Sequence, residues 1–360
     1  MGGIVMKLWK SGWEESRQRY LDWWSGKGLV ISMWEHLRKE GPAHEEVPAP
    51  PPPADISQFW FDPEWRAAYL HHQLSVSSFK ADILPVANTH LGPGSLAACL
   101  GARLEGREDT IWIREDAEPG EVISWTEENP WWKLHLDLLK ACRRLSEDRY
   151  FVGCPDLVEG LDTLAALKGT DRVLMEMITD PELLERQLQQ VNDIWYRAFS
   201  RIYDIIRVGD EMAFCYFSLW APGKVSKLQS DISLMISPED FRRFVQPYIR
   251  EQAAKLDYSL YHLDGVGALR HLDAILEIEA LKAVQWTPGV GEPQGGDPRW
   301  YALYRKILES GKSVMPCWVE PGELKPLLDH VGAEGVHVLM HFKSEKEIEE
   351  TVKIAASYRK

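Results

Sequence analysis

The sequence has a deficit of basic residues. Its 360 residues include 41 lysines and arginines against 55 aspartates and glutamates, which gives a formal net charge of −14. The basic residues are spread along the chain, so the clustered cations that binding to a phosphate backbone requires are missing. Nucleic acid is therefore not expected as a partner.

Cysteines and long apolar runs are also scarce. The five cysteines are an odd number and include no CxxC pair. The first twenty residues lack the apolar run of a signal peptide, and no stretch approaches the ~18 apolar residues that span a bilayer. We therefore expect a protein of the reducing cytoplasm that has no membrane partner.

One stretch of low complexity, residues 44–57 (HEEVPAPPPPADIS), interrupts the chain. Four consecutive prolines cannot form a helix or a central strand, so an extended surface loop is expected. Too few residues precede this loop for an independent core. We therefore expect a single domain over residues 1–360, in which 1–75 hold the N-terminal helices, the first strand and this loop, and 76–360 hold the rest.

Short apolar runs alternate with amphipathic helical patterns along the chain, which indicates βαβ units and parallel pairing. Eight such runs predict an α/β fold, a closed (β/α)8 TIM barrel with an N-terminal helical extension. A doubly wound open sheet is the alternative, but no GxGxxG follows the first strand. The predicted strands are 29–33, 82–87, 149–154, 213–219, 258–263, 281–286, 312–317 and 335–340.

Polar residues follow several of these strands, at the barrel end where catalysis takes place in such folds. His262 and Asp264, two residues apart on one strand, would point to the same side. With His341 they would form a ligand set for a divalent metal with an open coordination position. Cys317 and Glu320 are expected as further ligands. The sequence contains no short zinc motif such as HExxH, so this pattern is only moderately specific for a metal site.

Other residues at the same end are candidates for catalysis and for binding. The candidate acid/base or orienting groups are Asp82, Asp156, Asp231 and His341. The candidate substrate-binding residues are His90, Trp220, Trp286 and Trp318. Structural alternatives stand beside these roles: Asp264 could cap the helix that begins near Gly267, and Cys317 could be an ordinary buried thiol.

Three stretches resemble the uroporphyrinogen decarboxylase superfamily, whose other main branch contains the corrinoid-linked methyltransferases. They are residues 79–92 (FKADILPVANTHLG), 162–191, and 230–249 (SDISLMISPEDFRRFVQPYI). The pattern ISPExFxxFVxPY in the last stretch is the most specific piece. The resemblance runs from about residue 75 to the end, and it implies a (β/α)8 barrel independently of the strand pattern.

The resemblance also implies two chemistries. The methyltransferases bind zinc through His-x-Cys after the fifth strand and a further Cys after the eighth. In this sequence, His262 matches the histidine of that pattern and Asp264 occupies the position of the first cysteine. His341 lies near the position of the second cysteine. Asp82 matches the key aspartate of the family, whereas ISMWEHLRKEG replaces the Arg-Gln-Ala-Gly-Arg segment of the decarboxylases.

We expect metal-assisted methyl (one-carbon) transfer that involves a small molecule or a corrinoid carried by a partner protein. Zinc is the metal that the resemblance suggests. The alternative is a metal-free decarboxylase or lyase for a carboxylate-bearing substrate, in which Asp82 stabilises a developing cation and His341 moves protons. A barrel that binds a ligand without catalysis is the third interpretation.

Overall fold

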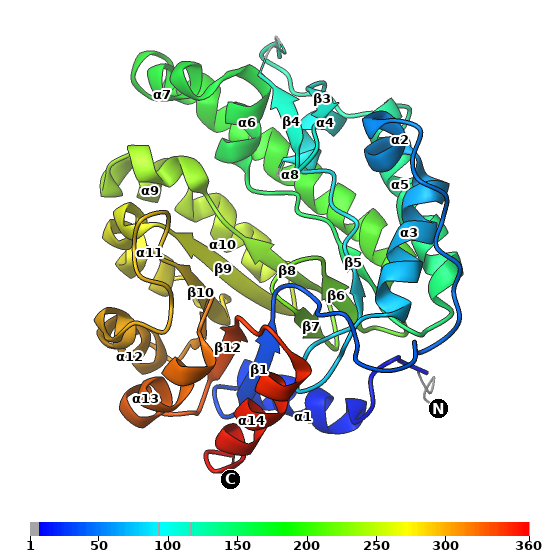
Figure 1. The fold of residues 1–360 in the computed structure, drawn as a ribbon. Coiled ribbons are helices and arrows are strands. Elements are labelled where there is room, and N and C mark those ends of the chain that lie inside the picture. Colours follow the sequence, from blue (N-terminus) through cyan, green and yellow to red (C-terminus); the bar gives the residue numbers. More distant parts are fainter. Residues whose placement is uncertain (1–6, 93, 116, 118, 360) are drawn as a thin grey trace.

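The structure, a computed structural model, describes residues 7–92, 94–115, 117 and 119–359. It confirms the α/β class, and most of the strands are parallel (Figure 1). Six parallel strands form the larger sheet, in the order β1-β12-β11-β10-β9-β8. Their bounds are β1 Leu29–Met33, β8 Val225–Leu228, β9 Tyr258–Asp264, β10 Ala283–Thr287, β11 Ser313–Pro316 and β12 Val336–Met340.

A second sheet has the order β2-β5-β6-β7. Its first three strands are parallel, and β7 returns antiparallel to β6. A separate antiparallel hairpin consists of β3 and β4. The bounds are β2 Val86–Ala87, β3 Arg103–Gly106, β4 Ile111–Arg114, β5 Phe151–Cys154, β6 Met212–Phe214 and β7 Leu219–Ala221.

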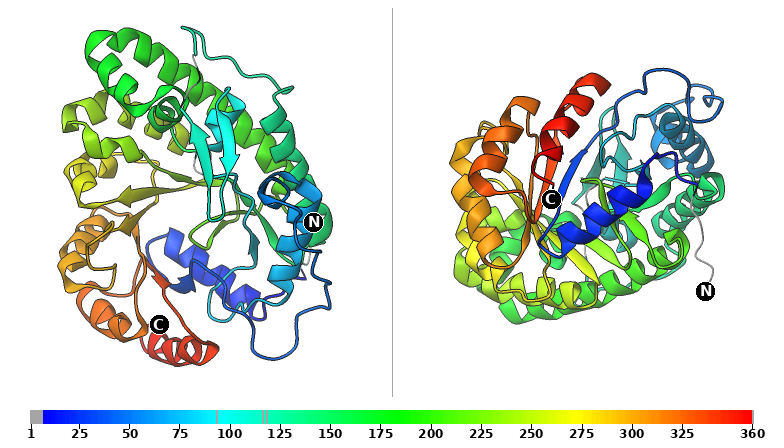
Figure 2. Two further views of the ribbon diagram at one scale, coloured as in Figure 1. Left: turned by 45° about the horizontal axis from the view of Figure 1, so that its top comes forward. Right: turned by 90° about the horizontal axis from the view of Figure 1, so that it is seen from below.

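Helices cover the outer side of the curved array of strands (Figures 1 and 2). Parallel strands buried on both faces read as nearly continuous apolar runs, and both β1 and β12 are buried throughout. The helices are α1 Trp13–Trp24, α2 Ile56–Phe61, α3 Pro63–Ser75, α4 Ser95–Cys99, α5 Pro130–Ser146, α6 Gly160–Lys168, α7 Thr170–Thr179, α8 Pro181–Ile206, α9 Pro238–Phe244, α10 Gln246–Ala254, α11 Leu272–Leu276, α12 Tyr301–Glu309, α13 Pro321–Val331 and α14 Glu345–Ala356, with 3-10 helices η1 Asp231–Met235, η2 Val266–His271 and η3 Pro298–Trp300.

Helix α1 lies across the end of the array from which the strands start (Figure 2, right). The indole nitrogen of Trp23 donates a hydrogen bond to the carbonyl of Val314, and the hydroxyl of Ser313 donates one to the carbonyl of Trp23. These bonds fix the helix against the first residues of β11. The opposite end, where the parallel strands finish, is therefore the end left for a site.

Local sequence signals explain several boundaries. Residues 44–55 form neither helix nor strand, as the prolines predict, and α2 begins at Ile56. The side chain of Ser237 accepts a hydrogen bond from the backbone N–H of Asp240, and Pro238 occupies the first turn of α9, so this helix begins where the sequence indicates. Among the described residues, no helix is both long and apolar enough to cross a membrane.

The predicted fourth strand, 213–219, is divided in the structure. β6 ends at Phe214, and the backbone adopts positive φ at Phe217 (62°) and Ser218 (49°) before it returns as β7. β9 pairs with β10 on one side, and its parallel partner on the other side is β8. The sequence prediction missed β8. Its inner side carries polar residues, so it does not show the apolar run of a buried strand. The strand end beside β9 is thus at 229–231 rather than at Trp220.

Asp82 lies in the segment that leads into β2 and forms hydrogen bonds with β1. Among the described residues, β1 and β2 do not pair as strands. The N–H of Asp82 donates to the carbonyl of Ile31 over 2.8 Å, and its carboxylate accepts from the N–H of Ile31 over 3.0 Å. The same carboxylate accepts from Ser16 of α1 and forms ion pairs with Arg19 (2.7 Å) and Arg359 (2.6 Å). Asp82 is fully buried. The contacts of its carboxylate hold the fold together, and a catalytic role for Asp82 stays a prediction.

The charges around Asp82 favour its ionised form. Burial by itself would raise the pKa of this carboxyl, but Arg359, Arg19 and Lys10 outweigh it and hold the pKa below the usual value. Removing one member of a buried ion pair leaves the other charges uncompensated. Asp82 is therefore expected to contribute strongly to stability.

We expect Asp82→Asn to lower the free energy of unfolding by about 3–5 kcal/mol, because Arg19 and Arg359 would face a neutral amide in a buried position. Urea denaturation measures this change. The control is Asp329→Asn, which removes the exposed ion pair with Lys325 and should leave the midpoint nearly unchanged. Equal midpoints for wild type and Asp82→Asn would contradict this role.

The contribution of Asp82 should also depend on pH. Because its pKa is lower in the folded than in the unfolded protein, its stabilising effect is present above the unfolded pKa of about 4 and is lost as the pH falls below it. The stability difference between wild type and Asp82→Asn should therefore shrink between about pH 6 and about pH 3. Urea denaturation over this range checks it, and a difference independent of pH would be the contrary result.

Candidate active site

Three neighbouring parallel strands present polar side chains at alternate positions near their carboxyl ends. Alternate residues of a strand point to the same side, so these side chains share the inner side of the array. Direct hydrogen bonds join Gln229 to Asp231, His262 to Gln285, and Gln285 to Thr287. The polar set comprises Lys227, Gln229 and Asp231 from β8 and its continuation, His262 and Asp264 from β9, and Gln285 and Thr287 from β10.

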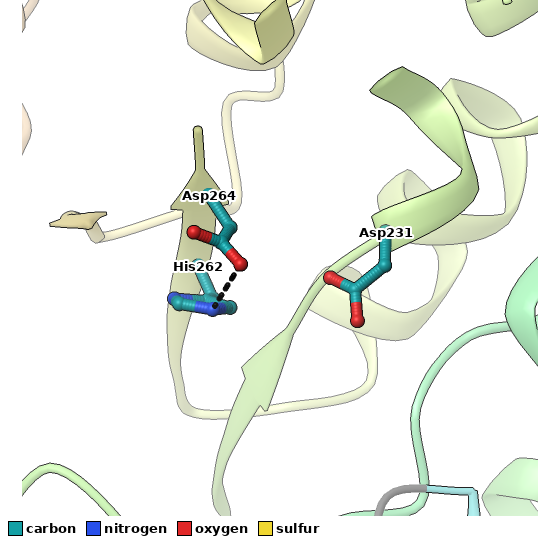
Figure 3. A group of neighbouring side chains, drawn as sticks. All are labelled: Asp231, His262 and Asp264. Atoms are coloured by element: carbon teal, nitrogen blue, oxygen red, sulfur yellow. Dashed lines mark ion pairs between the residues drawn. The ribbon is translucent and has the colours of Figure 1, made fainter. Parts of the chain in front are cut away.

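Asp231, His262 and Asp264 lie together at this end (Figure 3). One ligand atom from each residue lies within 4.8 Å of the others. His262 Nε2 is 3.9 Å from Asp264 Oδ2, and both residues project from β9, whereas Asp231 faces them from the start of η1. We call these three residues the His–Asp–Asp cluster. The side chain of Asp264 is 41% exposed, so a ligand can reach the cluster from the mouth of the array.

The hydrogen bonds of His262 fix which nitrogen faces the two carboxylates. Its Nδ1 bonds to the amide oxygen of Gln285, because the amide nitrogen of Gln285 donates to the hydroxyl of Thr287 over 2.9 Å. Nδ1 therefore holds the proton, and the lone pair of Nε2 is directed toward Asp264. Burial lowers the pKa of His262 to about 3, and Lys227 acts in the same direction, so the imidazole is neutral at pH 7.

The carboxylates of the cluster are perturbed in the opposite direction. Partial removal from water and, after it, the nearby charge of Asp162 together raise the pKa of Asp231 to about 7. The same desolvation raises the pKa of Asp264. A neutral nitrogen lone pair and two carboxylates thus face one another. Such an electron-rich arrangement is suited to a cation.

A buried chain of polar contacts supports Asp231. Lys227 forms an ion pair with Asp156, and its ammonium also donates to the amide oxygen of Gln229. The amide nitrogen of Gln229 in turn donates to Asp231 Oδ2 over 2.8 Å. Asp162 accepts the backbone N–H groups of Asp231 and Ile232, which holds the start of η1 in place. Asp156 is therefore a structural partner of Lys227 in this structure.

Sequence reasoning missed Lys227, Gln229, Gln285 and Thr287. A signal for the first two was available, because Lys227, Gln229 and Asp231 follow the two-residue period of a strand. The pattern Gln-x-Thr at 285–287 repeats that period beside His-x-Asp at 262–264. Polar residues at alternate positions of a buried strand are the signature of a site on its inner side.

His341 does not join His262 and Asp264, so the predicted ligand set is wrong in its third member. His341 Nδ1 bonds to Glu320 Oε1 over 2.7 Å, and the two residues line a separate pocket of about 420 Å³ together with Gln294, Trp318 and Glu323. Asp231, which we expected as an acid/base group, occupies the third position. Glu320 pairs with His341 rather than with the cluster. Cys317 is fully buried, and burial raises the pKa of its thiol.

Two of the tryptophans predicted as pocket walls belong to the core. Trp220 is fully buried and packs on Trp13, and Trp286 is fully buried and packs on Trp300, with ring centroids 5.1 Å apart in each pair. Trp286 points away from the inner side because its neighbour Gln285 points toward it. These two predictions are wrong for this reason.

Trp318 and His90 lie near the mouth but outside the cluster. Trp318 lines the pocket of His341, has a φ of 58° and stacks on Trp34. Nδ1 of His90 accepts the N–H of Gly92, and burial lowers the pKa of His90 to about 3. This contact orders the loop after β2. A role in substrate binding stays a prediction for both residues.

Comparison with known proteins adds no identification. No protein-family model matches this sequence, and none of the curated proteins matches it significantly.

We expect Gln285→Leu to release the fixed tautomer of His262, because the leucine cannot accept the Nδ1 proton. In ¹⁵N-edited NMR spectra, wild-type His262 should be the neutral Nδ1–H form, and the variant should show both neutral tautomers. His341, which bonds to Glu320, is the internal control and should keep its signals. An unaltered tautomer in Gln285→Leu would show that Gln285 does not orient the ring.

Proposed function

We propose that this protein is a cytoplasmic (β/α)8-barrel enzyme that holds one divalent metal ion between Asp231, His262 and Asp264. We further propose that it transfers a methyl group between a corrinoid, carried by a partner protein, and a heteroatom of a small molecule. The observation that supports the metal site best is the approach of three ligand atoms within 4.8 Å of one another. The five cysteines are all free and buried, which favours a reducing compartment.

The strand order supports a closed barrel. Six parallel strands follow one another from β1 to β8, and β2, β5 and β6 are parallel neighbours in the second sheet. The two hydrogen bonds between Asp82 and Ile31 join the sheets on one side. Helices lie outside the strands all around the array (Figure 2, left). This arrangement supports the proposal of a barrel whose site lies at the carboxyl ends of its strands.

The donor set fits a divalent cation. One imidazole nitrogen and two carboxylate oxygens suit Zn²⁺, Mn²⁺ or Fe²⁺, and they are harder ligands than a thiolate set. A bound metal would supply Lewis acidity, which activates a coordinated heteroatom at neutral pH. The chain provides the orientation: Gln285 fixes the imidazole, and Gln229 fixes one oxygen of Asp231. Lys227 pairs with Asp156, so its charge is already compensated.

Methyl transfer is proposed because of the resemblance to the corrinoid-linked branch, in which His262 corresponds to a metal ligand. In this reaction the carbon–cobalt bond breaks and cobalt keeps both electrons. The acceptor heteroatom forms the new bond to the methyl carbon and loses its proton. The metal-free decarboxylase is not proposed, because it needs Asp82 at the substrate and Asp82 is fully enclosed by Ser16, Arg19 and Arg359.

We expect the purified protein to bind one equivalent of Mn²⁺, which electron paramagnetic resonance can titrate. His262→Ala and Asp264→Asn should each weaken binding at least about 100-fold, because each removes a ligand from a small set. The matched control is His341→Ala, a histidine at the same end that pairs with Glu320, and it should keep wild-type affinity. Equal losses in His341→Ala and His262→Ala, or no binding by wild type, would refute the proposed site.

The methyl transfer itself has a separate test. Methylcobalamin and 2-mercaptoethanol serve as donor and acceptor probes, and the visible spectrum follows loss of the methyl group from cobalt. We expect turnover by the protein loaded with Zn²⁺ or Mn²⁺ and at least about a 100-fold slower rate for His262→Ala. A metal-loaded protein without turnover would contradict the reaction while the metal site remained.

A further inference from the structure

A pocket with mostly apolar walls lies beside the His–Asp–Asp cluster and shares Asp231 with it. Its volume is about 600 Å³, which falls in the range of sites for small molecules. Three segments supply its apolar walls. They are the strand β4 with Ile111, Trp112 and Ile113, the helix α6 with Ala165 and Ala166, and the 3-10 helix η1 with Ile232, Leu234 and Met235.

The apolar walls include side chains that a protein rarely leaves in water. Trp112 is 60% exposed, Met235 is 63% exposed and Leu234 is 39% exposed. Single exposed apolar residues are ordinary, but a group of them around a pocket indicates a contact surface. A side chain at Gly267 would lie 3.1 Å from Leu234, so this glycine leaves the room that Leu234 occupies. The walls are thus arranged to cover an apolar body.

The polar residues of the pocket restrict the charge of a ligand. Glu115, Asp162 and Asp231 line it, and no lysine or arginine does so among the described residues. Both oxygens of Asp162 already accept backbone N–H groups, and the amide of Gln229 is committed to Lys227 and Asp231. A carboxylate ligand would therefore meet negative charge without a compensating cation. A cationic ligand would compete with the metal for Asp231.

We infer that this pocket holds the body of the substrate, and that the substrate is an uncharged molecule with an aromatic or branched apolar body and one hydroxyl or thiol group. The inference rests on the proposed function, because the hydroxyl or thiol is the heteroatom that reaches the cluster at Asp231. The apolar body lies between Trp112 and the small side chains of Ala165 and Ala166. Carboxylated substrates, including those of decarboxylases, are excluded by the acidic lining.

Three probes of one shape test the charge preference: 2-naphthalenemethanol, 2-naphthoate and 2-naphthylmethylammonium. Saturation-transfer NMR measures their dissociation constants with and without Mn²⁺. We expect the alcohol to bind at least about ten-fold more tightly than either charged probe. With Mn²⁺ bound, the methylene protons of the alcohol should broaden more than the distant ring protons. Equal or tighter binding of the carboxylate or the ammonium would overturn the inference.

Two variants locate the binding. Ala166→Trp fills the pocket and should weaken binding of the alcohol at least about ten-fold, with Mn²⁺ affinity unchanged. Ile178→Ala is the control, because Ile178 is 80% exposed on α7 and does not line the pocket. Trp112→Ala provides a second test, since Trp112 is largely exposed and its loss should not disturb folding. Unchanged affinity for the alcohol in both Ala166→Trp and Trp112→Ala would overturn the assignment of this pocket as the binding site.

The metal site and the pocket can fail separately. If wild type binds no Mn²⁺ but binds the alcohol in a manner sensitive to Ala166→Trp, the pocket is supported and the proposed function is refuted. If Mn²⁺ binds with the expected dependence on His262 and the alcohol does not bind, the metal site stands and the inference about the substrate is overturned.

Discussion

The buried carboxylate of Asp82 is the constraint on which the arrangement of the strands depends. It pairs with the backbone of Ile31 in β1 and binds Arg19 of α1 and Arg359 near the end of the chain. Segments far apart in the sequence thus meet at one charged group, at a place where β1 and β2 share no ladder among the described residues. A buried charge is tolerated only when its partners compensate it, so these partners must all be in place together.

The apolar strands and the capped helices could be predicted from sequence, and β8 could not. Each of the eight predicted strand regions contains a strand, because a parallel strand buried on both faces reads as an apolar run. β8 departs from that rule, since its inner side carries Lys227 and the chain continues with Gln229 and Asp231. The proposed function would require these polar residues inside the fold, and local sequence rules fail most often at such positions. The split after β6 is equally non-local, because it depends on positive φ at Phe217 and Ser218.

The site could be predicted in part for a related reason. Two candidate ligands on one strand are related by strand geometry alone, so the pairing of His262 with Asp264 follows from the sequence. The third ligand depends on which strand is adjacent. β12 lies three strands away from β9 in the sheet, whereas β8 is its direct neighbour. Asp231 at the end of β8 lies beside His262, whereas His341 at the end of β12 bonds to Glu320. The pairing of β8 with β9 is a tertiary property that the pattern of a single strand does not contain.

Asp231 connects the two halves of the site through one short element. It begins η1, and Leu234 and Met235 of the same 3-10 helix form part of the apolar wall. Binding of a cation by the cluster, if the proposed site holds one, would favour the conformations in which Asp231 faces His262, and with them the position of that wall. A ligand that binds only the folded arrangement at 100 times its dissociation constant stabilises it by about 2.7 kcal/mol. Asp162 accepts the backbone N–H groups of Asp231 and Ile232 and so restrains the start of η1. The coupling between cation binding at Asp231 and the position of the apolar wall would therefore lose little to local motion. In the proposed enzyme, metal binding would thus prepare the pocket that receives the substrate.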